Sequence, residues 1–172
     1  MILEVATHAD ANAISEVAET TFKATFAHLY PPEDLATFLE NWMPPHKVAA
    51  QIADPDWMLR VIRNESGDII GYIKLGPVDF DLPEGQEAED AIELHQLYLL
   101  PAAHGSGAAA DMMDWAMTEA RARGAKRLFL SVYIDNLRAQ RFYARYRFYE
   151  VGKNAFHVGN IVDDDRIWRC DL

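Results

Sequence analysis

The chain has 172 residues, with 27 acidic and 16 basic side chains, a formal net charge of −11 and a single cysteine, Cys170. The lone cysteine excludes a disulfide scaffold, and the lack of an apolar stretch of about 20 residues argues against a membrane-spanning protein. The acidic balance argues against nucleic acid as the main partner, because phosphate contacts need basic side chains. With no visible secretory signal, the sequence predicts a cytoplasmic protein that folds as one domain over residues 1–172.

Apolar side chains recur with helical spacing in some segments and in strand-like runs in others. The predicted helices are 11–26, 32–43, 48–52, 108–123 and 136–146. The predicted strands are 2–6, 57–63, 69–75, 92–100, 127–133, 148–151 and 167–172. This order predicts an α/β protein with a sheet of mixed direction and helices on both faces.

Two segments are strongly acidic. Residues 79–93 carry no basic side chain, and residues 163–165 are three consecutive aspartates. We expect both to be solvated loops, and the alternative is that they attract a polycationic substrate.

The most informative segment is a glycine turn between a strand and a helix, Gly105-Ser106-Gly107. The first N–H groups of a helix have no internal partner, and glycines let an anion approach them, so the turn is typical of a phosphate site. A P-loop does not fit, because no Lys follows Gly107. Residues 105–110 match the residue types of a Rossmann fingerprint. Their position does not match, because four residues separate the glycines from the strand. The alternative is a strand–helix connection that needs glycine for its geometry alone.

Two motifs resemble the GNAT N-acetyltransferase superfamily. Residues 104–109 (HGSGAA) resemble its acetyl-CoA loop, Gln/Arg-x-x-Gly-x-Gly/Ala, and residues 136–145 (NLRAQRFYAR) resemble its N-x-x-A-x-x-F-Y-x-[KR] helix. The order of elements upstream also matches, so the resemblance covers nearly the whole chain. It implies a mixed, mostly antiparallel, twisted sheet of about six to seven strands with helices on both faces.

The resemblance also implies a function, an N-acetyltransferase that moves an acetyl group from acetyl-CoA to a primary amine of a small molecule. Because Cys170 lies outside every motif, direct transfer without an acyl-enzyme is the simpler mechanism. Residues 25–39 and 156–160 look like a bacterial branch of polyamine (spermidine/spermine) N-acetyltransferases. The alternatives are a non-catalytic acyl-CoA-binding or regulatory domain on the same fold and a Rossmann-like nucleotide site, and a homodimer is left open.

The chain departs from the family pattern at two positions. His104 stands where Gln or Arg is usual, and Arg147 stands where Gly commonly precedes the Phe. Arg147 therefore either adopts the positive φ that glycine supplies or lies in a different turn.

The resemblance places the cofactor on a strand backbone, on the glycine turn and on the helix that follows. The predicted cofactor-binding residues are Leu97, Tyr98, Leu99, His104, Gly105, Ser106, Gly107, Ala108, Ala109, Ala110, Asn136, Tyr143 and Arg145. Asn136 and Tyr143 are seven residues apart, so they share a helix face and lie about 10.5 Å apart along it. The alternatives are an N-cap for Asn136 and a core aromatic for Tyr143.

Three side chains are predicted to be catalytic. Tyr143 is the predicted acid, because a hydroxyl of pKa about 10 can donate to a departing thiolate of pKa about 8.5. Glu93 and His95 are two apart on one strand, so both face the same side of the sheet and either can accept the amine proton. Structural hydrogen bonds are the alternative for both.

The acceptor amine is expected to contact the first two helices and the late strands. Phe26, Tyr30 and Phe156 are the predicted contacts, with core packing as the alternative. We expect no metal site, because the six histidines lack ligand spacing.

Overall fold

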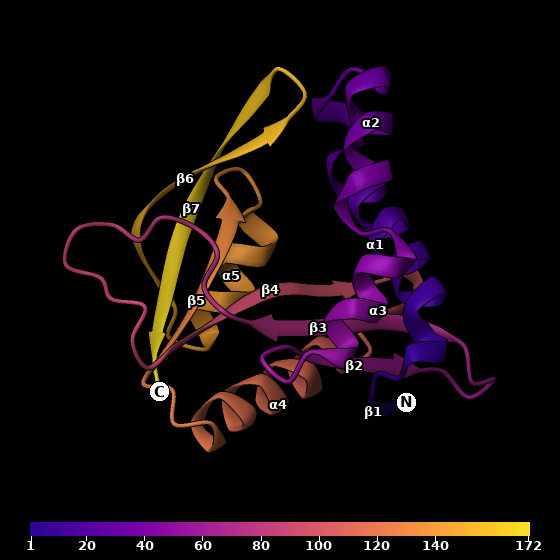
Figure 1. The fold of residues 1–172 in the computed structure, drawn as a ribbon, viewed down its shortest axis with the longest axis horizontal. Coiled ribbons are helices and arrows are strands. Elements are labelled where there is room, and N and C mark those ends of the chain that lie inside the picture. Colours follow the sequence, from indigo (N-terminus) through magenta and orange to yellow (C-terminus); the bar gives the residue numbers. More distant parts are fainter.

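The protein, described over residues 1–172 by a computed structural model, is built on one seven-stranded sheet in the order β1-β2-β3-β4-β5-β7-β6 (Figure 1). The strands are β1 (Ile2–Val5), β2 (Met58–Arg63), β3 (Ile69–Gly76), β4 (Ala91–Leu99), β5 (Arg127–Tyr133), β6 (Tyr149–Val158) and β7 (Ile161–Asp171). Every neighbouring pair is antiparallel except β4 and β5. The mixed, mostly antiparallel sheet predicted from the sequence is confirmed.

Helices cover both faces of this sheet (Figure 1). They are α1 (Ala11–Phe26), α2 (Pro32–Trp42), α3 (Pro45–Ala53), α4 (Ala108–Ala122) and α5 (Leu137–Arg145). Both α2 and α3 begin at a proline, whose fixed φ suits the first turn of a helix. None of the helices combines the length and the apolar composition needed to cross a membrane.

The core has a separate layer on each face of the sheet. On one face α4 presents the stripe of Ala108, Met112, Ala116 and Ala120, all fully buried, against β3 and β4. On the other face α1 and α3 pack on β2 and β3. A third cluster joins the end of α1 and α2 to Val158 at the end of β6. The sheet is therefore fixed from both sides, and its strands can hold a site between the layers.

The parallel pair β4 and β5 is joined over only one end. Ala91–Glu93 pair with Arg127–Phe129, and no pairing follows beyond Glu93. The two strands then diverge, and the edge of β4 that faces β5 has no strand partner from Leu94 onward. Because β4 and β5 are neighbours near the middle of the sheet, their divergence leaves a gap between strands inside the protein.

The two late strands are longer than the sequence predicted. Residues 148–151 and 167–172 were the predicted strands, whereas β6 and β7 form a continuous hairpin over Tyr149–Val158 and Ile161–Asp171. The acidic run 163–165 is therefore part of β7 and not a solvated loop, and Asp163 and Asp165 are buried. The prediction failed because polar residues occupy both faces here, so the apolar alternation that marks a strand is absent.

The turn after α5 adopts the conformation usually reserved for glycine. Arg147 has a φ of +65°, so of the two expected outcomes the positive φ is the one observed. A left-handed conformation costs a residue with a Cβ about 1–2 kcal/mol.

We expect Arg147→Gly to raise the free energy of unfolding by about 0.5–1 kcal/mol, because relief of this strain exceeds the entropy that glycine adds to the unfolded chain. Urea unfolding measures the change. Arg147→Ala is the control, because it removes the same side chain and keeps the strain. An equal gain in both variants would show that the guanidinium, and not the backbone, is responsible.

Candidate active site

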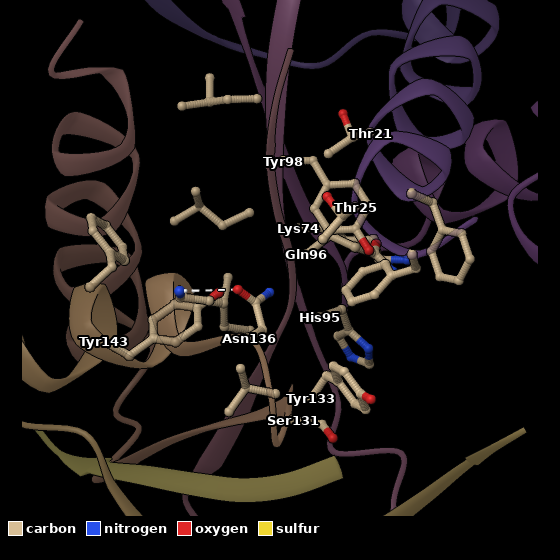
Figure 2. A pocket seen from close by; sticks show the side chains of 18 of the residues that line it. Thr21, Thr25, Lys74, His95, Gln96, Tyr98, Ser131, Tyr133, Asn136 and Tyr143 are labelled. Atoms are coloured by element: carbon tan, nitrogen blue, oxygen red, sulfur yellow. Dashed lines mark hydrogen bonds between the residues drawn. The ribbon is translucent and has the colours of Figure 1, made fainter. Parts of the chain in front are cut away.

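A cleft of about 1130 Å³ lies where β4 and β5 part. Its walls come from α1, α3, β3 and β4, from the glycine turn and α5, and from β5 to β7. Figure 2 shows Asn136 and Tyr143 on one side of the strands that cross the cleft and Thr21, Gln96 and Tyr98 on the other. The cleft therefore connects the two faces of the sheet.

The glycine turn forms one end of this cleft. Gly105 and Gly107 have φ values of +80° and +92°, and a Cβ at either position would meet no atom within 4 Å. The N–H groups of Gly105, Gly107 and Ala109 have no acceptor within the chain. Three free donors over open space at the start of α4 are the arrangement that an anion such as a phosphate requires.

Not every predicted residue of the turn faces this space. Gly105, Gly107, Ala109 and Ala110 line the cleft, whereas Ser106 and Ala108 do not. The Ser106 hydroxyl donates to the carbonyl of Ala103 at 2.7 Å and accepts from the Ala108 N–H at 3.3 Å. Ser106 thus stabilises the turn through hydrogen bonds within it.

His104 holds an arginine at the same end of the cleft. Its Nε2 lies 3.2 Å from the Leu99 carbonyl oxygen, and its Nδ1 lies 3.0 Å from Nη1 of Arg138. Because a carbonyl only accepts and a guanidinium only donates, Nε2 carries the ring proton and Nδ1 accepts. Both ring nitrogens are engaged, so Arg138 is the free cation at this position.

Arginines along α5 extend the positive charge from this point. Arg138, Arg141 and Arg145 line the cleft, and their spacing of three and four residues places them along one side of the helix. Arg145, a predicted cofactor residue, also lies over the Phe142 ring, 5.2 Å from its centroid. Arg138 and Arg141 are not among the residues predicted from the sequence, although their spacing within the helix motif is a visible signal.

Asn136 and Tyr143 both line the cleft on α5. The Asn136 Oδ1 accepts from the Ala139 N–H at 3.2 Å, so this residue is the N-cap of α5, and its amide nitrogen has no partner. Burial raises the pKa of the Tyr143 hydroxyl to about 12. The hydroxyl therefore stays protonated and available as a donor.

A β-bulge brings the polar side chains of β4 to one face. Lys74 on β3 pairs with Gln96, but the next residue, Leu75, pairs with Leu94. His95 is thus an extra residue on β4, which breaks the alternation of side chains. As a result Glu93, His95, Gln96 and Tyr98 all line the cleft. All three residues whose backbone was predicted to bind the cofactor, Leu97, Tyr98 and Leu99, line the cleft.

Glu93 and His95 form a buried hydrogen-bonded pair. Glu93 is only 5% exposed, so it does not belong to a solvated acidic loop as the sequence predicted. Its Oε1 lies 3.2 Å from Nδ1 of His95, its Oε2 accepts from the Asp79 N–H at 2.9 Å, and Nε2 of His95 lies 2.9 Å from the Pro77 carbonyl oxygen. Burial raises the pKa of Glu93 to about 8 and lowers the pKa of His95 to about 4. At neutral pH both are uncharged, and the Glu93 carboxyl donates to Nδ1.

The residues predicted to contact the acceptor amine lie together in the wall of the cleft. Phe26, Tyr30 and Phe156 line it and surround the buried ring of Phe22, with centroids 5.1, 6.0 and 6.3 Å from that ring. They contribute to the core and to the cleft wall at once.

Two buried carboxylates, which the sequence did not place in the cleft, stand beside these aromatics. The Tyr30 hydroxyl donates to Asp163, and the Ser131 hydroxyl donates to Asp165 at 3.1 Å. Burial raises the pKa of Asp165 to about 6, so this group is ionised for the most part at neutral pH. This acidic wall of Asp163 and Asp165 gives one end of the cleft a negative charge.

Comparison with known proteins agrees with this geometry. The family model described as Acetyltransferase (GNAT) family matches residues 14–148. An uncharacterized N-acetyltransferase of Mycobacterium tuberculosis is 34% identical over 163 residues, which are 95% of this chain and 98% of that protein. The chain therefore belongs to the GNAT acetyltransferase family, as the sequence motifs predicted.

Two further relatives show the breadth of the similarity. An aminoalkylphosphonate N-acetyltransferase of Salmonella typhimurium is 35% identical over 98 residues, 56% of this chain and 60% of that protein. The crystal structure of the PaiA N-acetyltransferase from Thermoplasma acidophilum, in complex with coenzyme A, covers the whole of both chains with a TM-score of 0.75 at 19% identity. The structural match confirms the fold.

The Glu93–His95 pair predicts a pH dependence of stability. Between pH 6.5 and pH 8 an unfolded chain has Glu93 ionised, whereas the folded chain keeps Glu93 protonated until the pH approaches its pKa of about 8. The folded state binds the extra proton, so stability falls as pH rises. His95 opposes this in part, because it is half protonated at about pH 6.5 in the unfolded chain and neutral in the folded one, and the net fall is about 1 kcal/mol over this window.

Urea unfolding at intervals from pH 6.5 to pH 8 measures this slope. Glu93→Gln is expected to abolish it, because the amide does not titrate. Glu84→Gln, a change at an exposed carboxyl, is expected to keep it. A Glu93→Gln variant with the wild-type slope would contradict the assignment.

Proposed function

We propose that this chain acts over residues 1–172 as a single N-acetyltransferase domain that moves an acetyl group from acetyl-CoA to a primary amine of a small molecule by direct transfer. The observation that carries the proposal is the cleft itself. It joins free N–H donors at the glycine turn and a buried tyrosine on one face of the sheet to a polar chamber on the other face.

The glycine turn and α5 fit the phosphates of acetyl-CoA. Gly105, Gly107 and Ala109 offer backbone donors, and Arg138 and Arg141 add charge beside them. Backbone donors and these few arginines suffice in a chain of net charge −11, because short-range hydrogen bonds outweigh a screened net charge. The structurally similar PaiA N-acetyltransferase of Thermoplasma acidophilum is in complex with coenzyme A, which supports coenzyme A as the carrier of the acetyl group.

Acetyl-CoA supplies an activated thioester, and an unprotonated amine attacks its carbonyl and releases the thiol. The unpaired edge of β4 around Leu97 to Leu99 offers backbone N–H groups that stabilise the negative charge on the carbonyl oxygen. Tyr143 gives its proton to the departing sulfur. Its raised pKa does not oppose this, because the same buried surroundings raise the pKa of the thiol as well.

Glu93 and His95 take the proton of the amine on the opposite face. The pair is neutral at pH 7, so its capacity as a base appears as Glu93 ionises near pH 8. Asn136 positions the cofactor through its free amide nitrogen while its oxygen caps α5.

The acidic wall supports an acceptor that arrives as an ammonium ion, as spermidine and spermine do. Asp163 and Asp165 attract the cation, and Phe26, Tyr30 and Phe156 enclose its carbon chain. Release of thiol from acetyl-CoA, measured over a panel of primary amines, tests the function. Tight CoA binding with no release for any amine would leave only a non-catalytic binding domain.

We expect Tyr143→Phe to lower kcat at least tenfold and to change the Kd of CoA less than threefold, because the lost proton donor acts on the leaving thiol and not on binding. Thiol release and calorimetric titration measure the two quantities. Tyr146→Phe is the matched control, because Tyr146 is the C-cap of α5, three residues after Tyr143, and does not line the cleft. Equal loss in both variants would remove Tyr143 from the acid role.

We expect Gly107→Ala to weaken CoA binding about tenfold or more, because a Cβ there strains a φ of +92° and enters the space over the free donors. Gly124→Ala, at a φ of +81° beyond the end of α4, carries similar strain away from the cleft. Titration calorimetry compares the two, and equal CoA affinity would show that the glycine turn does not hold the cofactor.

A further inference from the structure

We propose that the acceptor carries an anionic group, a carboxylate or a phosphonate, and that Lys74 binds it inside the cleft. This inference rests on the proposed function and specifies the class of its substrate. The acceptor is then a small molecule with an amine at one end and an oxyanion at the other.

Lys74 is a buried ammonium group without a counter-ion. The residue is 3% exposed, and no carboxylate lies within 4.0 Å of its Nζ. Its contacts are the Gln51 Oε1 at 3.3 Å, the Met43 sulfur at 3.5 Å and the Trp57 ring, whose centroid is 5.1 Å away. Because a buried unpaired charge is costly, its place in the wall of an open cleft points to an anion that enters from solvent.

A second lysine reinforces the positive charge. Lys47 on α3 lines the same cleft, and burial together with the nearness of Lys47 lowers the pKa of Lys74 to about 8. Glu93 and Asp79 act in the opposite direction, but the Glu93 carboxyl is already bonded to His95 and to the Asp79 N–H. Lys47 is an exposed residue whose Nζ donates to the Trp42 carbonyl oxygen at 3.1 Å, so it adds positive charge to the cleft, and Lys74 is the buried ammonium group without a carboxylate partner.

A polar side chain without a partner lies directly across from Lys74. Gln96 is its neighbour in the β3–β4 register, and the Gln96 Oε1 is buried and makes no hydrogen bond. A half-turn of the amide exchanges oxygen for nitrogen and would present N–H donors at this point. Lys74 and Gln96 together then supply the donors that an oxyanion needs.

The position of this site assigns the anion to the acceptor and not to the cofactor. Lys74 and Gln96 lie beside Tyr98 on the face of the sheet opposite Tyr143 and Asn136 (Figure 2). The acidic wall on β7 lies in the same cleft. The chamber therefore carries positive charge at β3 and negative charge at β7. The acidic wall taken alone suits a polyamine, but the two charges together favour an amine that bears an oxyanion.

The test uses four acceptors with a similar short chain: γ-aminobutyrate and aminopropylphosphonate as anionic probes, putrescine as the diamine, and butylamine as the neutral-ended amine. In wild type we expect kcat/KM for at least one anionic probe to exceed that for putrescine and butylamine tenfold or more. A preference for putrescine or butylamine overturns the inference and leaves the proposed function intact. Absence of thiol release with every amine refutes the proposed function itself.

Lys74→Gln assigns the preference to this side chain. We expect it to lower kcat/KM for the anionic probes at least tenfold, mainly through KM, and to leave butylamine within about threefold. Lys153→Gln, which removes an exposed lysine on β6, is the control for loss of charge alone. An unchanged preference in Lys74→Gln overturns the inference. If that variant does not fold, Lys74→Met, which keeps the length and apolar body of the side chain, replaces it.

Discussion

The early parting of β4 from β5 is the constraint on which the rest of the structure depends. The two central strands pair only over Ala91–Glu93 and Arg127–Phe129, so a backbone edge that a regular sheet would satisfy is left unpaired in the interior. Such groups are costly unless a ligand or solvent completes their hydrogen bonds. The opening forms a cleft that passes between the two faces of the sheet. The glycine turn and α5 line it on one face, and α1, α3 and β7 line it on the other.

Local charge, and not net charge, defines what this passage can bind. The chain has a formal charge of −11, yet Arg138, Arg141 and Arg145 give the α5 side a positive wall. On the opposite face Lys74 and the carboxylates of Asp163 and Asp165 are buried in the walls of the cleft. Burial removes these groups from screening by salt, so they act on a bound molecule more strongly than the many exposed carboxylates of the surface.

Much of this protein follows from short-range sequence signals. The spacing of apolar residues located α1, α4, α5 and β5 closely, and the glycine turn and the helix motif around Asn136 and Tyr143 led to the family. These predictions succeeded because helical periodicity, a positive φ at glycine and an N-cap are properties of a few consecutive residues. The backbone largely determines them before any distant contact forms.

The sequence alone therefore determined the order of elements, the glycine turn and the side chains that α5 presents. Tertiary structure decided how polar residues are buried and paired: the bulge at His95 that gathers Glu93, Gln96 and Tyr98, and the unpaired Lys74. It also placed Asp163 and Asp165 in a long strand, where the sequence pattern suggested a loop. The physical reason is that register, burial and the pKa shifts they cause depend on strands and helices far apart in the chain, which no local pattern records.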